Sequence, residues 1–288
     1  MSAPDPVVYL SGEYLPKSQA RISVEDRGTL FADGVYEVIR YYAGQPLALE
    51  GHLARLRRSL GGIRLPEPSA LEELPAISDE LLRRNGIRDA KMYWQITRGQ
   101  APREHCFPAT CEPTVLAIAY PVGPMNLEET PASWRVCLDE DRRWTECWIK
   151  SLMLLPNVLA RQAAREAGCQ EVILHRDGRV TEGSAANVFI VRGGELVTHP
   201  ADRWILSGIT RNLLIELARA EGVTVREEPF TTDELLAADE IFFTGTTTHL
   251  AAAVEVDGQT IGEGTPGPVT RQLHRIFVDH VARTCGLR

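Results

Sequence analysis

The sequence predicts an α+β protein of two domains. Its 288 residues are enough for about two domains of usual size, each with its own core. Stretches that alternate apolar and polar residues, typical of strands, are interspersed with stretches of helical periodicity. Between two strand-like regions lies Pro121-Val-Gly-Pro-Met-Asn126, whose prolines and glycine are typical of a linker. We therefore expect a small N-terminal α+β domain over 1–120, a linker over 121–133 and a larger domain over 134–288.

The first domain is expected to contain short strands and two amphipathic helices. In the strand over 34–42, alternation puts Tyr36, Val38 and Arg40 on one face. The helix over 52–60 repeats leucine at helical spacing, and Arg55 lies outside that apolar stripe. The other expected elements are strands over 7–10, 13–15, 91–97 and 114–119 and a helix over 71–84.

The second domain is expected to mix strands with three helices. Gly168 ends the first of these helices, and Ser207-Gly-Ile-Thr210 has the character of a helix N-terminus before an apolar-periodic run. The expected strands are 135–138, 171–174, 187–191 and 239–243, and the expected helices cover 157–167, the run that reaches residue 220, and 268–283.

Composition excludes several classes of partner. The formal net charge of −8 and the pI near 5.5 leave no basic excess to displace phosphate counterions, so we expect no nucleic-acid partner. The N-terminus lacks the features of a signal peptide, and the longest uncharged runs are too short to span a membrane. Six cysteines are scattered without a C-x-x-C pair, which predicts reduced thiols and no metal site. We expect a soluble, cytoplasmic protein with no membrane partner.

Lys150 is the first candidate for chemistry. Of the 31 basic residues only three are lysines (Lys17, Lys91 and Lys150), so 28 are arginines. A lysine kept in such a sequence suggests a role that arginine cannot fill, and an amine that deprotonates and forms a Schiff base is the clearest one. The alternative is a surface lysine that has no function.

Four further features suit a phosphorylated cofactor. The N–H groups that begin the helix after Ser207-Gly-Ile-Thr210 can bind an anion, and so can the amides and hydroxyls of Thr244-Gly-Thr-Thr-Thr248. Arg55 could add a cation, and Glu182 could pair with the ring nitrogen of pyridoxal phosphate. Each feature also has an ordinary explanation: an N-cap, a turn, a solvated arginine or a solvent-facing carboxylate.

Taken together, these motifs resemble the fold-type IV pyridoxal-phosphate aminotransferases, and among them most closely the D-amino acid transaminases. The resemblance extends over nearly the whole chain, in order. The matching runs are Asp26-Arg-Gly with Asp33-Gly-Val-Tyr-Glu-Val, His52-Leu-Ala-Arg-Leu, Thr97-Arg-Gly with Pro102-Arg-Glu-His, Ile149-Lys-Ser-Leu, Leu155-Pro-Asn-Val-Leu-Ala, Thr181-Glu-Gly-Ser with Asn187-Val-Phe, Gly208-Ile-Thr-Arg and Asp239-Glu-Ile-Phe-Phe-Thr.

The resemblance implies a role for each matching position. Lys150 would form the Schiff base with pyridoxal 5'-phosphate and later move the proton between substrate and cofactor, and Glu182 would hold the pyridine nitrogen. Arg143 would support Glu182. The phosphate would be bound by Arg55, Ile209, Thr210 and Thr246, with Ser184 as a further cofactor ligand, and the substrate carboxylate by Tyr36, Arg103, His105 and Thr247.

Some positions depart from the family pattern. Ala185 and Ala186 follow Ser184 where related enzymes often have a serine run, and Gly245 stands where a hydroxyl is common. Trp148 replaces a smaller polar residue. Two cofactor hydrogen bonds are therefore expected to be missing, which puts cofactor affinity and substrate range in question.

The fold implied by the resemblance is a small N-terminal α/β sandwich followed by a larger domain with a mixed, barrel-like sheet, in a homodimer with sites near the interface. The implied activity is ping-pong transfer of an amino group from a D-amino acid such as D-alanine to a 2-keto acid such as 2-oxoglutarate. Three rivals share the fold: an L-branched-chain transaminase, an (R)-amine transaminase and an aminodeoxychorismate-type lyase. A rival of another class is a non-catalytic protein that binds a phosphate ligand.

Overall fold

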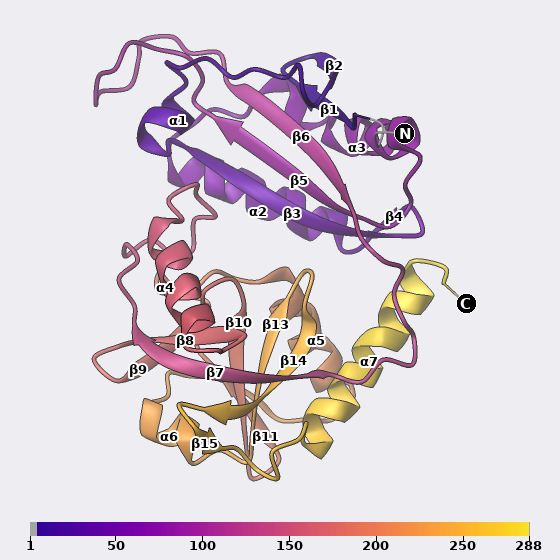
Figure 1. Ribbon diagram of the computed structural model, residues 1–288, viewed down its shortest axis with the longest axis vertical. Coiled ribbons are helices and arrows are strands. Elements are labelled where there is room, and N and C mark those ends of the chain that lie inside the picture. The colour runs from indigo at the N-terminus through magenta and orange to yellow at the C-terminus, as the bar shows by residue number, and fades with distance from the viewer. Residues whose placement is uncertain (1–4, 288) are drawn as a thin grey trace. The chain divides into compact units, whose positions relative to one another are not determined.

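A computed structural model of the protein describes residues 5–287. It consists of two compact units (Figure 1). The first comprises the described residues of Met1–Met125, Ile149–Met153 and Thr284–Arg288, and the second comprises Asn126–Trp148 and Leu154–Arg283. The short segment that carries Lys150 therefore belongs to the same unit as the N-terminal part of the chain.

The first unit is built on a six-stranded sheet in the order β2-β1-β6-β5-β3-β4. All of its neighbouring strands are antiparallel, and β3 pairs with β5 from Gly34 opposite Thr97 to Tyr41 opposite Ala90. The strands are β1 (Val7–Leu10), β2 (Glu13–Pro16), β3 (Gly34–Tyr42), β4 (Gln45–Pro46), β5 (Ala90–Thr97) and β6 (Thr114–Pro121).

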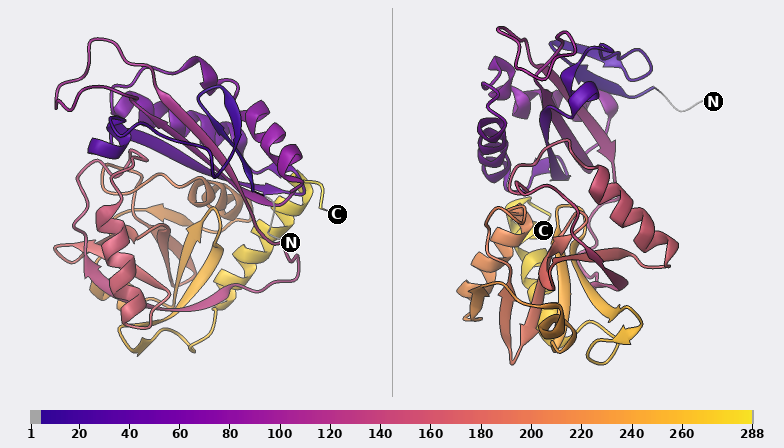
Figure 2. Two further views of the ribbon diagram at one scale, coloured as in Figure 1. Left: turned by 45° about the horizontal axis from the view of Figure 1, so that its top comes forward. Right: turned by 90° about the vertical axis from the view of Figure 1, so that its left-hand side faces the viewer.

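Helices cover one face of this sheet (Figure 2). Helix α2 packs against β3, and α3 packs against β1, β5 and β6. Alternation along β3 turns Val35, Glu37 and Ile39 toward the helices, whereas Tyr36 and Val38 lie half-buried on the opposite face. The helices are α1 (Arg27–Phe31), α2 (Leu49–Gly62), the 3₁₀ turn η1 (Ser69–Leu71) and α3 (Leu74–Asn85).

The second unit is built on a nine-stranded mixed sheet in the order β12-β11-β10-β13-β14-β7-β8-β9, with β15 paired to β14. Pairs β7–β8, β7–β14 and β11–β12 are parallel. The sheet curls so that β9 also contacts β10, and its register shifts at two places, which bends the strands. The strands are β7 (Ala132–Glu140), β8 (Glu171–Arg176), β9 (Arg179–Gly183), β10 (Asn187–Arg192), β11 (Glu195–Thr198), β12 (Val225–Glu227), β13 (Glu240–Gly245), β14 (His249–Val256) and β15 (Gln259–Thr260).

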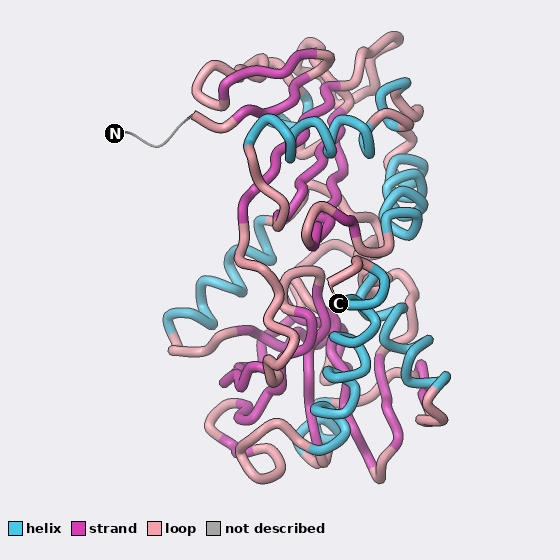
Figure 3. Tube along the Cα trace, turned by 90° about the vertical axis from the view of Figure 1, so that its right-hand side faces the viewer, coloured by secondary structure: helices cyan, strands magenta, loops and turns pink. Residues whose placement is uncertain are grey.

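Four helices accompany this sheet: α4 (Leu155–Glu166), α5 (Ile209–Ala220), α6 (Thr232–Leu236) and α7 (Pro268–Thr284). Helix α4 packs on β7 and β8, and α5 packs on β12 and β13. Helix α7 runs beside the sheet (Figure 3). The ring of Phe277 on this helix lies 5.7 Å from that of His249 on β14. No helix within residues 5–287 is long and apolar enough to cross a membrane.

The predicted α+β class and the mixed, curled sheet of the larger part are confirmed. Several elements were not expected from the sequence, among them β14. Its sequence is rich in alanine, a poor strand former, and the strand is specified by pairing with β13 on one side and β7 on the other. Glu182, expected between two strands, lies on β9 itself.

Candidate active site

Lys150 is fixed by backbone contacts at the start of β3. Its carbonyl accepts from Tyr36 N–H at 3.0 Å, and its own N–H donates to Ser59 Oγ at 3.2 Å. Leu152 N–H donates to the Gly34 carbonyl at 3.0 Å, so this short segment pairs with the strand. The Lys150 Nζ atom lies 4.3 Å from the centre of the Tyr36 ring. The structure therefore brings together two of the residues predicted for the site, the amine and the phenol.

A buried charged cluster lies on the other face of β3. Arg55 Nε and Nη2 donate to the two oxygens of Glu37 at 2.7 and 2.8 Å, and His52 Nδ1 lies 2.8 Å from Glu37 Oε2. Arg55 is 3% exposed, so it is not the solvated arginine that its position outside the apolar stripe would suggest. Its orientation is set by Glu37, which sequence reasoning did not identify.

The electrostatics of this cluster follow from burial and pairing. Burial opposes ionisation of Glu37, but the Arg55 guanidinium and the His52 ring outweigh it and hold the pKa of Glu37 well below its usual range. Burial lowers the pKa of His52, and the Arg55 and Lys150 cations lower it further, against the effect of Glu37. At neutral pH the cluster is therefore an ionised carboxylate held by an arginine and a neutral imidazole.

Arg103 and His105 lie on the loop between β5 and β6, and both are exposed. The guanidinium carbon of Arg103 is 5.3 Å from the centre of the Phe31 ring, and the His105 ring is 5.5 Å from it. Among residues 5–287, no hydrogen bond, ion pair or ring contact joins either residue to Tyr36 or Lys150. The structure thus brings Arg103 and His105 to each other, but not to the other two within one chain.

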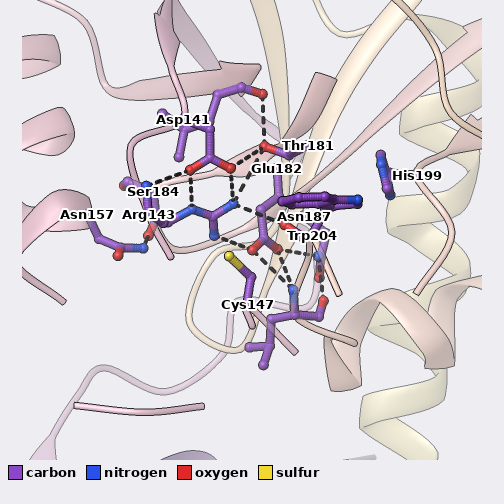
Figure 4. Close-up of polar contacts among 12 residues, drawn as sticks. Asp141, Arg143, Cys147, Asn157, Thr181, Glu182, Ser184, Asn187, His199 and Trp204 are labelled. Carbon is purple, nitrogen blue, oxygen red and sulfur yellow. Dashed lines mark hydrogen bonds and ion pairs between the residues drawn. The ribbon is translucent and has the colours of Figure 1, made fainter. Parts of the chain in front are cut away.

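In the second unit, Glu182 is buried and surrounded by donors (Figure 4). Its Oε1 accepts from Arg143 Nη1 at 2.5 Å, and its Oε2 accepts from Asn187 Nδ2 at 2.8 Å. The Leu206 N–H is within 3.1 and 3.2 Å of the two oxygens. Burial raises the pKa of Glu182, although Arg143 and the Leu206 N–H oppose the rise. The result is a carboxylate that is rigidly oriented and a stronger proton acceptor than usual.

Arg143 is held in turn by Asp141. Arg143 Nε and Nη2 donate to the two Asp141 oxygens at 2.9 and 2.8 Å, and Thr181 Oγ1 donates to Asp141 Oδ2 at 3.0 Å (Figure 4). Burial alone would lower the pKa of Arg143, but Glu182 and Asp141 together raise it. Burial also raises the pKa of the nearby Cys147 thiol to about 11, so this thiol stays neutral. Arg143 therefore remains a fixed cation between two carboxylates.

The start of α5 has the properties of an anion site. Its N-cap, Gly208, has no side chain that could cap the helix, so the first N–H groups of this 12-residue helix, beginning with Ile209 and Thr210, receive no hydrogen bond from that position. A Cβ atom at Gly208 would lie 2.0 Å from Asn187 Oδ1, which shows how closely the backbone approaches that side chain. Asn187 Nδ2 also donates to the Leu206 carbonyl at 2.8 Å.

The other predicted anion-binding segment follows β13. Asn187 on β10 lies opposite Thr244, whose buried Oγ1 has no hydrogen-bond partner within the described chain. Gly245 and Thr246 are half-buried, and Thr247 is exposed. Asn187 therefore connects Glu182, the start of α5 and the end of β13.

Ser184 uses its polar groups within the protein. Its Oγ donates to Glu171 Oε1 at 2.5 Å, and its N–H lies 3.2 Å from the same oxygen. Its carbonyl accepts from Asn157 Nδ2 at 2.7 Å (Figure 4). These contacts order the turn between β9 and β10, and a cofactor contact from Ser184 stays a prediction.

Sequence reasoning missed four residues that shape these clusters: Glu37 in the first unit, and Asp141, Asn187 and Leu206 in the second. Glu37 had a detectable signal, because a carboxylate stood on the otherwise apolar face of a strand. The other three residues had no signal in the sequence. Leu206 acts through its backbone N–H, and the partners of Asp141 and Asn187 come close only in the folded protein.

Comparison with known proteins places these features in a family. The amino-transferase class IV family model matches residues 34–256. The chain is 42% identical to D-alanine aminotransferase of Bacillus licheniformis over 92% of this chain and 94% of that protein. It is 41% identical to D-alanine aminotransferase of Listeria innocua over 97% of each.

The similar solved structures are also aminotransferases. A branched-chain aminotransferase from Thermoproteus uzoniensis, solved with norvaline, has a TM-score of 0.88 and 29% identity and covers 97% of this chain and 95% of its own. The branched-chain amino acid aminotransferase of Escherichia coli has a TM-score of 0.86 and 28% identity and covers 94% of this chain and 93% of its own. Another branched-chain amino acid aminotransferase, solved with pyridoxamine 5'-phosphate, has a TM-score of 0.88 and 28% identity over 97% of this chain and 95% of its own. The chain therefore belongs to the amino-transferase class IV family.

Proposed function

We propose that this protein is a pyridoxal-phosphate transaminase that moves the amino group of a D-amino acid, such as D-alanine, to a 2-keto acid, such as 2-oxoglutarate. The observation that carries the proposal is the 42% identity to a D-alanine aminotransferase over 92% of the chain. Matches of 39% to 41% over at least 95% of the chain, to enzymes of the same name from Listeria and Staphylococcus, support it.

The residues of the two units suit pyridoxal phosphate. The uncapped start of α5, with Ile209 and Thr210, offers N–H groups to a phosphate, and the unpaired Thr244 Oγ1 lies at the end of β13, next to Gly245 and Thr246. Arg55 and Thr246 are further phosphate ligands in this proposal. When bound, the cofactor supplies an aldehyde that condenses with amines and a ring that withdraws electrons from the substrate carbon.

Lys150 would supply the amine and the base. Its amine would hold the cofactor through a Schiff base. When free and uncharged, Lys150 Nζ would take the proton from the substrate α-carbon and give it up again as the amino group is transferred. Ser59 and Tyr36 hold the Lys150 backbone, so the flexible part of this residue is confined to its side chain.

Glu182 would keep the ring nitrogen protonated. Its two oxygens already accept from Arg143, Asn187 and Leu206, and a carboxylate has about four acceptor positions, so it can take one more N–H. Arg143 keeps Glu182 in place and, being tied to Asp141, cannot swing away. Ionised Glu182 facing a ring N–H gives a charge-assisted hydrogen bond.

Tyr36, Arg103, His105 and Thr247 would bind the substrate carboxylate. Arg103 supplies a guanidinium fork, and the phenol and imidazole supply further donors.

We also propose a homodimer. The apolar face of α4 supports it, because Leu155, Val158 and Leu159 are 67%, 58% and 60% exposed and form a continuous strip on one side of the helix.

A cytoplasmic location is part of the same proposal. All six cysteines are free thiols, as expected of a protein in a reducing compartment.

The second candidate is an L-branched-chain transaminase, which the solved structures favour. Steady-state assays with D-alanine, L-leucine and (R)-1-phenylethylamine, each against 2-oxoglutarate, distinguish it from the D-amino acid and (R)-amine activities. We expect turnover with D-alanine and ping-pong kinetics. Activity with L-leucine alone would refute the proposed substrate class, and release of pyruvate from aminodeoxychorismate would identify a lyase.

Borohydride reduction tests the role of Lys150. We expect a yellow protein whose cofactor becomes covalently attached to Lys150 on reduction, and a Lys150→Ala variant without turnover. Peptide mass spectrometry locates the label. A label on Lys17 or Lys91, or a colourless protein that reduction does not change, would support the non-catalytic alternative.

A further inference from the structure

We propose that Phe31 is a positioning residue that orients Arg103 and His105 for capture of the substrate carboxylate. This inference rests on the proposed function, in which those two side chains bind the carboxylate. Phe31 itself would not touch the substrate. It would act by holding two exposed, flexible side chains in one arrangement before the substrate arrives.

Three groups that are cationic or can become so meet around the Phe31 ring. The guanidinium carbons of Arg27 and Arg103 lie 4.8 and 5.3 Å from its centre, and the His105 ring lies 5.5 Å away, tilted by 46°. These distances are within the range of cation–π and ring contacts. Arg103 and His105 are both exposed, so contact with the ring restricts rotamers that solvent would leave free.

Phe31 is itself held in place by a rigid support. It ends the short helix α1, whose N-cap Asp26 accepts from Gly28 N–H at 2.8 Å. The other Asp26 oxygen accepts from the hydroxyls of Thr97 and Thr114 at 2.9 and 2.7 Å, which ties α1 to β5 and β6. The helix that carries Phe31 is therefore anchored to the two strands that flank the Arg103 loop.

The backbone of the loop is held from the same helix. Arg27 is buried, and its Nη1 donates to the carbonyls of Glu104 and Cys106 at 2.6 and 3.3 Å, on either side of His105. Arg27 Nε donates to Asp33 at 2.8 Å, and Asp33 also accepts two donations from Arg98 at the base of the loop. Arg27 thus fixes the loop backbone, and Phe31 fixes the side chains that project from it.

The test compares Phe31→Leu with Phe31→Tyr in the full-length, cofactor-loaded enzyme. Leucine stays apolar but has no aromatic face, whereas tyrosine keeps the ring and is the matched control. We expect Phe31→Leu to raise the KM for D-alanine and for 2-oxoglutarate by about five-fold, with kcat little changed, because two weak ring contacts are lost. Phe31→Tyr should behave like the wild type. Thermal unfolding of both variants confirms that each is folded.

A double-variant comparison separates this role from a general effect on structure. In an Arg103→Ala/His105→Ala background, Phe31→Leu should leave KM unchanged, because the side chains through which it acts are absent. The inference is overturned if Phe31→Leu raises KM equally in that background, or if it has no effect in the wild type. If the Arg103→Ala/His105→Ala protein itself keeps the wild-type KM, the proposed carboxylate site is wrong and the inference falls with it.

Discussion

Glu37 and Arg55 form a two-point ion pair in which both side chains are almost fully removed from solvent, 0% and 3% exposed. The pair joins the central part of β3 to α2. His52, one helical turn before Arg55, contacts the same carboxylate. Glu37 therefore determines how the proposed phosphate ligand Arg55 is oriented, and it does so from the face of β3 opposite Tyr36.

We predict that Glu37→Gln lowers the free energy of unfolding by about 3 kcal/mol, because Arg55 would remain charged and buried without its partner. Denaturant unfolding followed by circular dichroism measures the loss. Glu80→Gln is the matched control. Glu80 is also an ion-paired carboxylate, with Arg83 and Arg84 as partners, but it lies on the surface, where the loss of stability should be much smaller. Equal losses of unfolding free energy for the two variants would show that burial of the Glu37–Arg55 pair does not increase the cost of removing the carboxylate.

The same pair predicts a dependence on pH. The pKa of Glu37 is lowered on folding, so the unfolded chain binds this proton more readily than the folded one, and stability rises with pH in that range. The contribution is complete above the ordinary glutamate pKa of about 4.3 and is lost as the pH falls below it toward the folded pKa. The stability difference between wild type and Glu37→Gln should therefore narrow as the pH falls from about 5 to about 3. If the stability difference between wild type and Glu37→Gln stayed constant over this pH range, the lowered pKa of Glu37 could not be its cause.

The extent to which the site could be predicted from the sequence depends on the kind of signal. Lys150 was detectable because lysine is so rare in this chain, and the start of α5 because the Ser207-Gly-Ile-Thr210 pattern before the apolar-periodic run is local. The role of Asn187 could not be inferred, since its partners are a carbonyl, a carboxylate and a glycine backbone that only the folded sheet brings to it. Among the strands, β14 escaped prediction for the same reason: its pairing partners, not its own residues, determine its conformation.

We predict that Glu182→Gln keeps cofactor binding but lowers kcat on the order of 100-fold, the range in which a preorganised charge contributes to catalysis. The neutral amide cannot hold the ring nitrogen protonated, and its NH₂ group would face the donors Arg143, Asn187 and Leu206. Steady-state kinetics and the cofactor absorption spectrum measure the two effects.

The control for that variant is Glu240→Gln. Glu240 is another buried carboxylate, and it accepts from the first N–H groups of α7 at Val269 and Thr270. Its loss should reduce stability but leave kcat close to the wild-type value. Near-normal turnover in Glu182→Gln would refute the assigned role.

The last prediction concerns Gly208 and Gly245, one in each of the two predicted anion-binding segments. A Cβ at Gly208 would lie 2.0 Å from Asn187 Oδ1, whereas a Cβ at Gly245 would meet its nearest atoms, in Thr248, at 3.6 Å. Gly208→Ala must therefore displace Asn187 and weaken its donations to Glu182 and the Leu206 carbonyl. We expect this variant to lose about 1–3 kcal/mol of stability and to bind the cofactor more weakly, and Gly245→Ala to resemble the wild type.

Removing the clash partner tests the cause. Asn187→Ala should lower the free energy of unfolding strongly in the wild type, where it deletes one buried and one partly buried hydrogen bond. The loss should be smaller in the Gly208→Ala protein, where the Asn187 side chain is already displaced. Unfolding free energies and cofactor dissociation constants of the four proteins give the coupling between the two positions. Additive losses would mean that Gly208→Ala acts elsewhere, for example by changing the start of α5 directly. A large loss of stability or cofactor affinity in Gly245→Ala would also contradict the explanation. A Cβ at Gly245 would make only ordinary van der Waals contact at 3.6 Å, which gives no reason for such a loss.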